Sequence, residues 1–204
     1  MRRRVASALS VLLLVVGGVQ GGRGAWIYAK AELAQVLLRQ AWAETRAGGE
    51  RVRPWPWADA WPVARIILPE SDHIVLAGAS GRNLAFAPGH LDGTAEPGGL
   101  GTCVIAGHRD THFAELEDLI VGDTIALEDA SGTVATYRVV ASAVVDESRT
   151  EVLAETFEPI LVLITCWPFD AISPGGPLRY VVWAENVETL ERQNVERYRP
   201  PSRS

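Results

Sequence analysis

From Ala64 to Asn186 the chain consists of short apolar segments separated by turn residues, and this pattern limits the fold more than any other feature. Segments of this kind, bounded by glycine, proline or aspartate, are typical of β-strands. Eight of them in about 120 residues predict a closed or nearly closed β-barrel. We expect strands at Arg65–Leu68, His73–Ala77, Asn83–Phe86, Thr102–Ala106, Thr124–Leu127, Val134–Val145, Ile160–Thr165 and Leu178–Ala184.

The segments between these strands predict turns and one short helix. Phe113–Leu119 has the pattern of a short helix, and Gly122-Asp123 is expected to turn the chain back. Asp129-Ala130-Ser131-Gly132 predicts a hairpin turn between two strands. The expected fold class is therefore mainly β, a closed eight-stranded barrel with short helices.

The first 24 residues predict a signal anchor, that is, a membrane-spanning segment that stays attached. No charged residue lies between Arg4 and Arg23, and 18 residues in a helix extend about 27 Å, close to the thickness of a bilayer core. Arginines at positions 2–4 precede this segment, which predicts a cytoplasmic N-terminus and an exported remainder. A cleaved signal peptide, with Val19-Gln20-Gly21 at the cleavage site, is the alternative.

Residues 25–62 connect the membrane segment to the barrel. Ala25–Trp42 has apolar residues at helical spacing and predicts an amphipathic helix, which Ala47-Gly48-Gly49 ends. This helix is expected either to lie at the membrane interface or to pack on the barrel. For the tryptophans of Pro54–Pro62, a membrane-interface belt and a clamp on the outside of the barrel both stay open. The barrel is expected over residues 63–186, and residues 187–204 form a polar tail.

The segment Leu161–Asp170, LVLITCWPFD, brings a cysteine to the end of a strand. Trp167-Pro168 must end this strand, so Cys166 is expected at the rim of the sheet. A cysteine needed only for packing suits the middle of a strand better, because it behaves as a small hydrophobic residue. From this segment alone, a reactive thiol and a structural thiol both remain open, since exposure and pKa decide between them.

Two other strands direct polar residues toward the same rim. Arg179 begins one strand, and the short link before it, rich in proline and glycine, predicts an antiparallel return beside the Cys166 strand. In such a pair the end of one strand faces the start of the next, which places Cys166 and Arg179 together. His108 follows Gly107 at the end of a third strand. It reaches this rim if that strand runs parallel to the Cys166 strand.

The order of GHRDTHF, LITCWPF and PLRYVVWA is similar to the His, Thr-x-Cys and Arg motifs of sortases, the membrane-anchored cysteine transpeptidases. The segment APGHLDGTAEPGGLGTCVIAGHR also resembles the sortase core. KAELAQVLLRQAW and PWPWADAWPVARI resemble the upstream region of the Gram-negative sortase subgroup. The resemblance covers about Lys30 to Ala184, and three ordered motifs are far more specific than one.

The resemblance implies a transpeptidase that needs no cofactor. Cys166 is expected to be the nucleophile, His108 the general acid and base, and Arg179 the clamp on the oxyanion and substrate. The implied substrate is a protein with an LPXTG-like C-terminal sorting signal, cut after its Thr and passed to an amine acceptor. The reaction class is that of a cysteine endopeptidase, a hydrolase acting on peptide bonds. Five more residues are assigned to substrate binding or to the surroundings of the site: Thr165, Trp167, His90, His112 and Asp110.

Two alternatives compete with this hypothesis. A Cys103–Cys166 disulfide would make the chain a non-catalytic periplasmic barrel that binds a partner. The disulfide and the enzyme exclude each other: Cys103 precedes His108 by up to about 16 Å of strand, whereas bridged Cα atoms lie within about 7 Å. A zinc site built from His108, His112, Asp110 and His90 is the other alternative, although histidines four apart need a helix to share one face.

The formal net charge of −6 restricts the partners. Binding of nucleic acid needs a basic face, so no nucleic acid is expected. The partners that remain are the protein substrate, the amine acceptor and the inner membrane, reached through the N-terminal helix. The expected location is the inner (cytoplasmic) membrane, with a single span and the catalytic domain in the periplasm.

Overall fold

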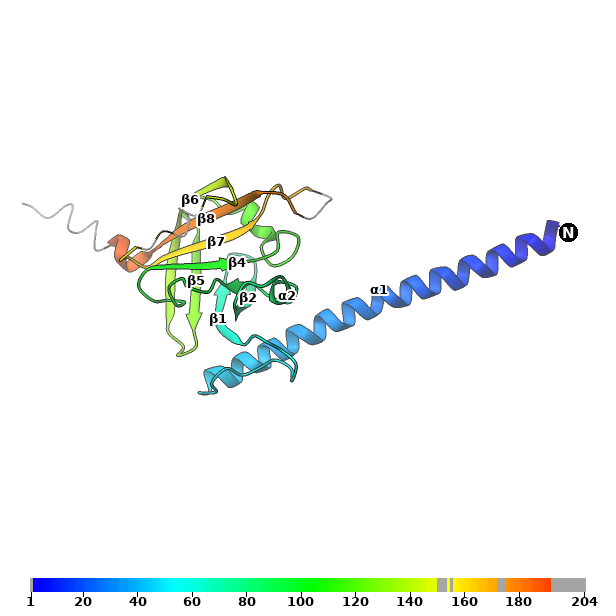
Figure 1. Cartoon of the computed structure of the whole chain (residues 1–204), viewed down its shortest axis with the longest axis horizontal. Coiled ribbons are helices and arrows are strands. Elements are labelled where there is room, and N and C mark those ends of the chain that lie inside the picture. Colours follow the sequence, from blue (N-terminus) through cyan, green and yellow to red (C-terminus); the bar gives the residue numbers. More distant parts are fainter. Residues whose placement is uncertain (1, 150–153, 155, 172–174, 192–204) are drawn as a thin grey trace, which may run out of the picture. The chain divides into compact units, whose positions relative to one another are not determined.

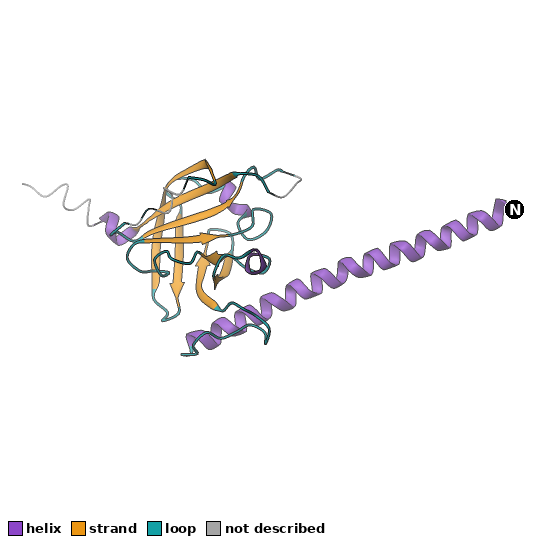
Figure 2. Ribbon diagram, in the orientation of Figure 1, coloured by secondary structure: helices purple, strands orange, loops and turns teal. Residues whose placement is uncertain are grey.

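The computed structural model describes residues 2–149, 154, 156–171 and 175–191, without the side chains of residues 2–15, 24, 25, 27 and 28. Eight strands close into a barrel in the order β1-β2-β3-β4-β7-β8-β6-β5 (Figures 1 and 2). Neighbouring strands are antiparallel except for two parallel pairs, β2 with β3 and β4 with β7. The strands are β1 (Pro62–Ile67), β2 (Asp72–Ala77), β3 (Gly89–His90), β4 (Thr102–Ala106), β5 (Thr124–Asp129), β6 (Val134–Asp146), β7 (Ile160–Cys166) and β8 (Leu178–Asn186).

The barrel interior is filled by one face of each long strand. In β1 buried and half-buried residues alternate, as expected when every second side chain points inward. The largest fully buried side chains in this interior are Tyr137 and Phe113. The rest of the interior comes mainly from aliphatic residues, including Ala64, Ile66, Val75, Ile105, Leu127, Leu161, Leu163 and Val182.

Strands β4, β7 and β8 are also apolar on their outer face. Val104, Val162 and Val181 are fully buried there, one from each strand. Leu91, Val145, Ile164 and Trp183 pack around them. Burial on both faces explains why LVLI of β7 is a continuous apolar run rather than an alternating one.

The predicted mainly β barrel is confirmed, with one wrong strand and one missed strand. Asn83–Phe86 is not a strand but overlaps the short helix α2 (Gly81–Leu84). Ser80 caps this helix by accepting a hydrogen bond from the Asn83 backbone N–H at 3.3 Å. The missed strand, β3, has only two residues, too few for a periodic pattern. It pairs with both β2 and β4 and so closes the barrel.

The turns and the short helix lie where the sequence predicts them. Residues Ala114–Glu117 form a single 3₁₀ turn, η1, inside the predicted helix. Gly122 and Gly132 both have positive φ, +105° and +95°, the conformation that their two turns require. Asp129 holds the β5–β6 turn through hydrogen bonds from the backbone N–H groups of Ser131 and Thr133.

The N-terminal segments form one helix, α1 (Arg2–Arg46), and not two. The chain divides into two compact units, Met1–Leu37 and Leu38–Ser204. The end of α1 belongs to the second unit, in which Leu38 and Trp42 pack with Ile74 and Leu76 of β2. For this end of the helix, packing on the barrel is the alternative that the structure shows.

The predicted membrane segment receives no support from the structure. Among the residues described, no helix is both long and apolar enough to cross a membrane. Most of the segment between Arg4 and Arg23 lies in the part of α1 whose side chains are outside the described residues. Residues 192–204 of the predicted polar tail lie outside the described residues as well.

Candidate active site

The register of three strands brings His108, Cys166 and Arg179 to one level of the barrel. In the parallel pair β4–β7, each residue faces the one 58 positions later, from Thr102 with Ile160 to Ala106 with Ile164. The printed pairs end at Ala106, and extending this register by two residues predicts His108 level with Cys166. In the antiparallel pair β7–β8, Cys166 faces Arg179 directly. The antiparallel return of β8 expected from the sequence is confirmed, and the condition set for the His108 strand, a parallel run beside β7, is met.

Cys166 and Arg179 form a close pair. The Trp167 N–H donates to the Leu178 carbonyl at 3.1 Å, so Trp167 and Leu178 form a hydrogen-bonded pair of the ladder. The next pair, Cys166 with Arg179, is therefore of the non-hydrogen-bonded type, in which Cα atoms lie about 4.5 Å apart. In Figure 1 β4, β7 and β8 run side by side, with β7 in the middle.

Gly107 and Thr165 fasten the end of β4 to the end of β7. The Gly107 N–H donates to the Ile164 carbonyl at 3.0 Å, and the Thr165 hydroxyl donates to the Gly107 carbonyl at 2.8 Å. Thr165 is buried and points into the barrel. Its hydroxyl therefore holds in place the residue that precedes His108, which is a positioning role.

Arg109 joins the loop of His108 to the loop that follows Cys166. Its guanidinium is 4% exposed and donates to the carbonyls of Pro168, at 2.6 Å, and Ala171, at 2.7 Å. Asp110 is exposed and accepts from the Arg109 Nε–H at 3.1 Å. One cation thus ties together the two loops that carry the candidate acid and nucleophile. No motif singled out Arg109, because the sequence does not reveal which carbonyls a loop leaves unpaired.

We expect Arg109→Ala to lower the free energy of unfolding by about 2–4 kcal/mol, because two carbonyls lose a charged donor that is shielded from water. Arg82→Ala is the matched control: Arg82 is 75% exposed and pairs with Asp59 on the surface, so the expected loss is at most about 0.5 kcal/mol. Urea denaturation followed by tryptophan fluorescence measures both. Equal losses in the two variants would contradict the role given to Arg109.

The two cysteines are free, and their surroundings differ. Cys103 lies inside the barrel, where burial raises the pKa of its thiol to about 12, with a further contribution from Glu96. Cys166 is half-buried at the rim. The disulfide alternative is therefore wrong. The register explains why this disulfide does not form: Cys103 of β4 faces Leu161 of β7, which precedes Cys166 by five residues.

A groove of about 250 Å³ crosses the outside of the barrel next to Arg179. Its floor is apolar and comes from Val104, Ala106, Ile164 and Val181. Charged residues, including Glu147 and Arg179, stand at one end. Cys166 follows Ile164 by two residues and shares its face of β7, so the groove leads toward the sulfur.

Arg179 is held by its own turn and by a residue of the segment after β6. Its Nη1 group donates to the carbonyls of Gly176, at 2.6 Å, and Leu178, at 2.9 Å. Its Nη2 group donates to the carboxylate of Glu147. No motif pointed to Glu147, which lies in the ordinary-looking polar stretch Asp146–Arg149. The barrel order, with β6 beside β8, is needed to bring it to the site.

Three aromatic rings cluster at the end of β7. The indole of Trp167 stacks on Tyr180, with ring centroids 5.8 Å apart, and Phe169 meets both rings edge-on. Phe169 and Tyr180 also pack against the barrel core, and Tyr180 faces Thr165, which points inward. The Trp167–Pro168 peptide bond is cis. The cluster therefore lies on the interior side of β7 and β8, and the assignment of Trp167 to substrate binding stays a prediction.

The other two histidines assigned to the site lie in different surroundings. His90 is buried, and its Nε2 bonds with the Ala95 carbonyl at 2.9 Å and the Thr94 hydroxyl at 3.1 Å, so its ring serves the loop after β3. His112 packs edge-on against His73, with centroids 5.4 Å apart. It is close enough to His108 for the two rings to influence each other electrostatically. Among the described residues, no cluster of His, Cys, Asp and Glu has a geometry that holds a metal ion.

We expect the folded protein to lose stability between about pH 6.5 and pH 4 because of His112. Burial, together with the nearby His73 and His108 rings, lowers the pKa of His112 to about 4, whereas the unfolded chain takes up this proton near 6.5. Between these values the unfolded state binds more protons, so lowering the pH favours unfolding. Burial lowers the pKa of His73 as well, against the opposing effect of Glu115.

Urea midpoints at pH 7.5 and pH 4.5 measure this dependence. The difference between them should shrink strongly in His112→Gln and only slightly in His108→Gln, which removes the smallest of the three contributions that lower this pKa. An unchanged difference in His112→Gln would contradict the role of this ring.

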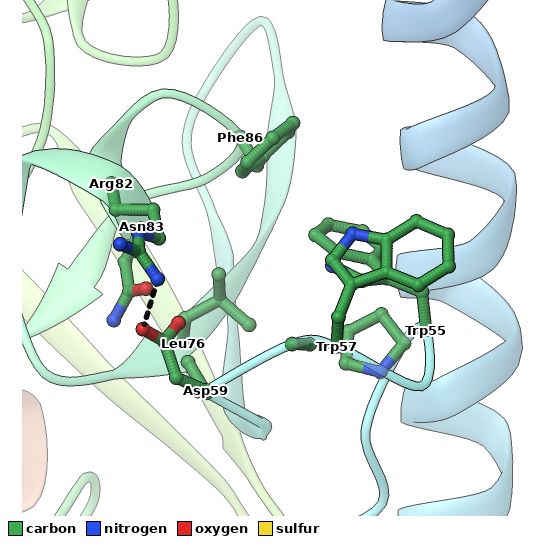
Figure 3. A pocket seen from close by; sticks show the side chains of 10 residues that line it. Trp55, Trp57, Asp59, Leu76, Arg82, Asn83 and Phe86 are labelled. Atoms are coloured by element: carbon green, nitrogen blue, oxygen red, sulfur yellow. Dashed lines mark hydrogen bonds and ion pairs between the residues drawn. The ribbon is translucent and has the colours of Figure 1, made fainter.

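A second pocket, of about 270 Å³, lies elsewhere on the barrel unit and shares no lining residue with the groove. Figure 3 shows its walls, in which Trp55 and Phe86 are 4.9 Å apart and Arg82 pairs with Asp59 at 3.1 Å. Trp57 is 81% exposed at this pocket. Two tryptophans of Pro54–Pro62 therefore differ in burial: Trp55 packs on the barrel unit, whereas Trp57 is exposed to solvent.

Comparisons with known proteins agree with this geometry. The sortase domain family matches residues 67–187, more than half of the chain. Sortase D of Bacillus subtilis (strain 168) is 31% identical over 114 residues, which cover 55% of this chain and 57% of the relative, so the chain matches little more than half of that protein's length.

Two solved structures have the same fold and similar identity. Sortase A from Corynebacterium diphtheriae has a TM-score of 0.58 and 31% identity, with 64% of this chain and 63% of that one covered. The catalytic domain of SrtD from B. anthracis has a TM-score of 0.53 and 33% identity, with 62% and 87% covered. With its family match, its barrel and its cysteine at the rim of β7, the chain belongs to the sortase family, the cysteine transpeptidases.

Proposed function

We propose that the protein cleaves an LPXTG-like C-terminal sorting signal after its Thr and transfers the protein substrate to an amine acceptor. The observation that carries this proposal is the shared level of Cys166, His108 and Arg179, set by the register of β4, β7 and β8. A thiol, an imidazole and a guanidinium in one place supply a nucleophile, a proton carrier and a donor for an oxyanion. The groove beside Arg179, with its apolar floor, supports the binding of a peptide segment.

In the first half-reaction the sulfur of Cys166, as thiolate, attacks the carbonyl carbon of the substrate's Thr. The carbonyl oxygen becomes an oxyanion, which accepts hydrogen bonds from the guanidinium of Arg179. The carbon–nitrogen bond then breaks, and the leaving amine takes a proton from His108. The products are a thioester on Cys166 and the released C-terminal peptide.

In the second half-reaction the acceptor amine attacks the thioester carbon. His108 now takes the proton from the amine, and the sulfur leaves as the thiolate. An amide bond replaces the thioester, and the enzyme returns to its starting state.

A trapping experiment with the full chain tests this function. Peptides of the form Leu-Pro-Xaa-Thr-Gly, varied at Xaa, are incubated with the protein and hydroxylamine, a small nucleophile that stands in for the acceptor. Mass spectrometry should detect cleavage after Thr, a hydroxamate product and an acyl adduct on Cys166. If no peptide of the set acylates Cys166 although iodoacetamide alkylates the same thiol, this function is wrong.

Membrane anchoring and location complete the proposal. The uncharged segment between Arg4 and Arg23, preceded by three arginines, supports a single inner-membrane span with the barrel in the periplasm. The upstream motifs at Lys30–Trp42 and Pro54–Ile66 support membership of the Gram-negative sortase subgroup. Alkaline carbonate extraction of membranes tests the anchor: an anchored chain stays in the pellet, whereas a chain released by cleavage appears in the supernatant.

A further inference from the structure

The guanidinium of Arg179 is paired with the carboxylate of Glu147. The Nη2 group of Arg179 donates to Glu147, and both side chains line the groove that leads to Cys166. The Glu147 side chain is 56% exposed and that of Arg179 is 27% exposed. The ion pair is therefore open to water within the groove, where the proposed substrate would meet the guanidinium of Arg179.

The backbone around Glu147 is fixed, so this contact follows from the fold. Strand β6 ends at Asp146, which faces Leu178 of β8. The Glu147 N–H donates to the Pro177 carbonyl at 2.6 Å. The Asp146 carboxylate accepts from the backbone N–H and the hydroxyl of Ser148, at 3.0 and 2.6 Å, which shapes the turn. Asp146 is thereby engaged by its own turn, and Glu147 is the acidic side chain that reaches Arg179.

The two ends of the guanidinium are bound to unequal partners. Nη1 donates to the carbonyls of Gly176 and Leu178, which belong to the turn and the strand that carry Arg179. Those bonds persist as long as the turn keeps its shape. Nη2 is bound to an exposed side chain, and an ion pair of this kind contributes little to stability. Nη2 is therefore the donor that can exchange its partner.

We propose that Glu147 is a built-in competitor of the substrate for Arg179: it holds Nη2 in the resting enzyme and is displaced when the substrate carbonyl binds. This inference rests on the function proposed above and deepens it. A carboxylate and an oxyanion are both strong acceptors for a guanidinium, and a carboxylate held on Nη2 neutralises the charge that the substrate oxygen would otherwise meet, so the two compete for the same cation. Because substrate must first release Glu147, the carboxylate weakens substrate binding and leaves Arg179 paired when the groove is empty.

A charge-selective alkylation tests the competition without any sorting signal. Iodoacetate is an anion and iodoacetamide is its neutral analogue, so the ratio of their rates with Cys166 reports the free positive charge beside the thiol. Glu147→Gln keeps the size of the side chain and removes its charge. We expect the iodoacetate to iodoacetamide ratio to rise about 3- to 10-fold in this variant.

Asp146→Asn is the matched control, since it removes the adjacent negative charge but leaves Glu147 on Arg179. We expect its ratio to change less than about 2-fold. An equal rise in both variants would mean a general effect of net charge and would overturn the competition. An unchanged ratio in Glu147→Gln would overturn it as well. Urea midpoints of both variants confirm that the fold is retained.

Kinetics with a peptide that the wild-type protein cleaves give the second readout. If Glu147 competes with substrate, Glu147→Gln lowers KM by about 3- to 10-fold. If Glu147 instead orients Arg179 for catalysis, the same variant lowers kcat and leaves KM unchanged, which overturns the proposal. Failure of the wild-type protein to cleave any peptide counts against the proposed function alone, because the alkylation ratio still decides whether Glu147 restrains Arg179.

Discussion

Cys166→Ala is expected to lower peptide-dependent amide exchange by about 10⁴-fold or more, to the background rate of the buffer. The reason is that no other group at this level of the barrel can form the thioester, since Cys103 is buried inside the barrel with its pKa raised to about 12. Exchange is measured as the hydroxamate formed from a fluorescent sorting-signal peptide and hydroxylamine.

Cys103→Ala is the control for this substitution. Removing the Cys103 sulfur leaves a small gap in the core, which lowers stability by about 1 kcal/mol but leaves the thiol at the rim untouched. We therefore expect exchange within about twofold of wild type once both proteins are shown to be folded. Retained exchange in Cys166→Ala, or its loss only in Cys103→Ala, would reverse the assignment of the nucleophile.

Arg179→Ala is expected to lower kcat by about 10²- to 10³-fold, the usual cost of removing a donor to an oxyanion. KM should rise as well, by about 3- to 10-fold, because Arg179 also binds the substrate carbonyl, but the larger loss falls on kcat, since the oxyanion exists only in and near the transition state. Arg179→Lys restores the charge but not the two-pronged donor, so it should recover only part of the loss. The measurement is a full set of initial rates against peptide concentration.

Arg82→Ala provides the comparison for Arg179, since it removes an arginine from a surface ion pair outside the groove. Its rates should match the wild type. A decrease of less than about threefold in Arg179→Ala would show that Arg179 does not contact the oxyanion, whatever its place beside Cys166.

The meeting of the three candidate catalytic residues could be predicted from the sequence because each of them lies at the end of a strand or directly beside one. Cys166 ends an apolar run, His108 follows one and Arg179 begins one. The rim was therefore predictable from the strands, given one assumption about direction. That assumption, a parallel β4–β7 pair, is what the structure adds.

The residues around the catalytic group were less predictable, for a physical reason. Arg109 acts on backbone carbonyls of a distant loop, and Glu147 reaches Arg179 only because β6 lies beside β8. Neither contact leaves a local pattern of apolar spacing or a motif. The same limit explains β3, whose two residues are paired on both sides but are too few to show alternation, and α2, whose start depends on a single cap at Ser80.

The candidate groove lies on the outer wall of the barrel, over a second apolar layer, while the interior is filled with side chains. A polypeptide that uses this groove is laid along the surface and is not threaded through an opening. For the proposed function, this means that a folded substrate of any bulk stays outside while only its terminus enters the groove. That function would then set no upper limit on the size of the substrate, and its selectivity would depend on the few residues that touch the terminus.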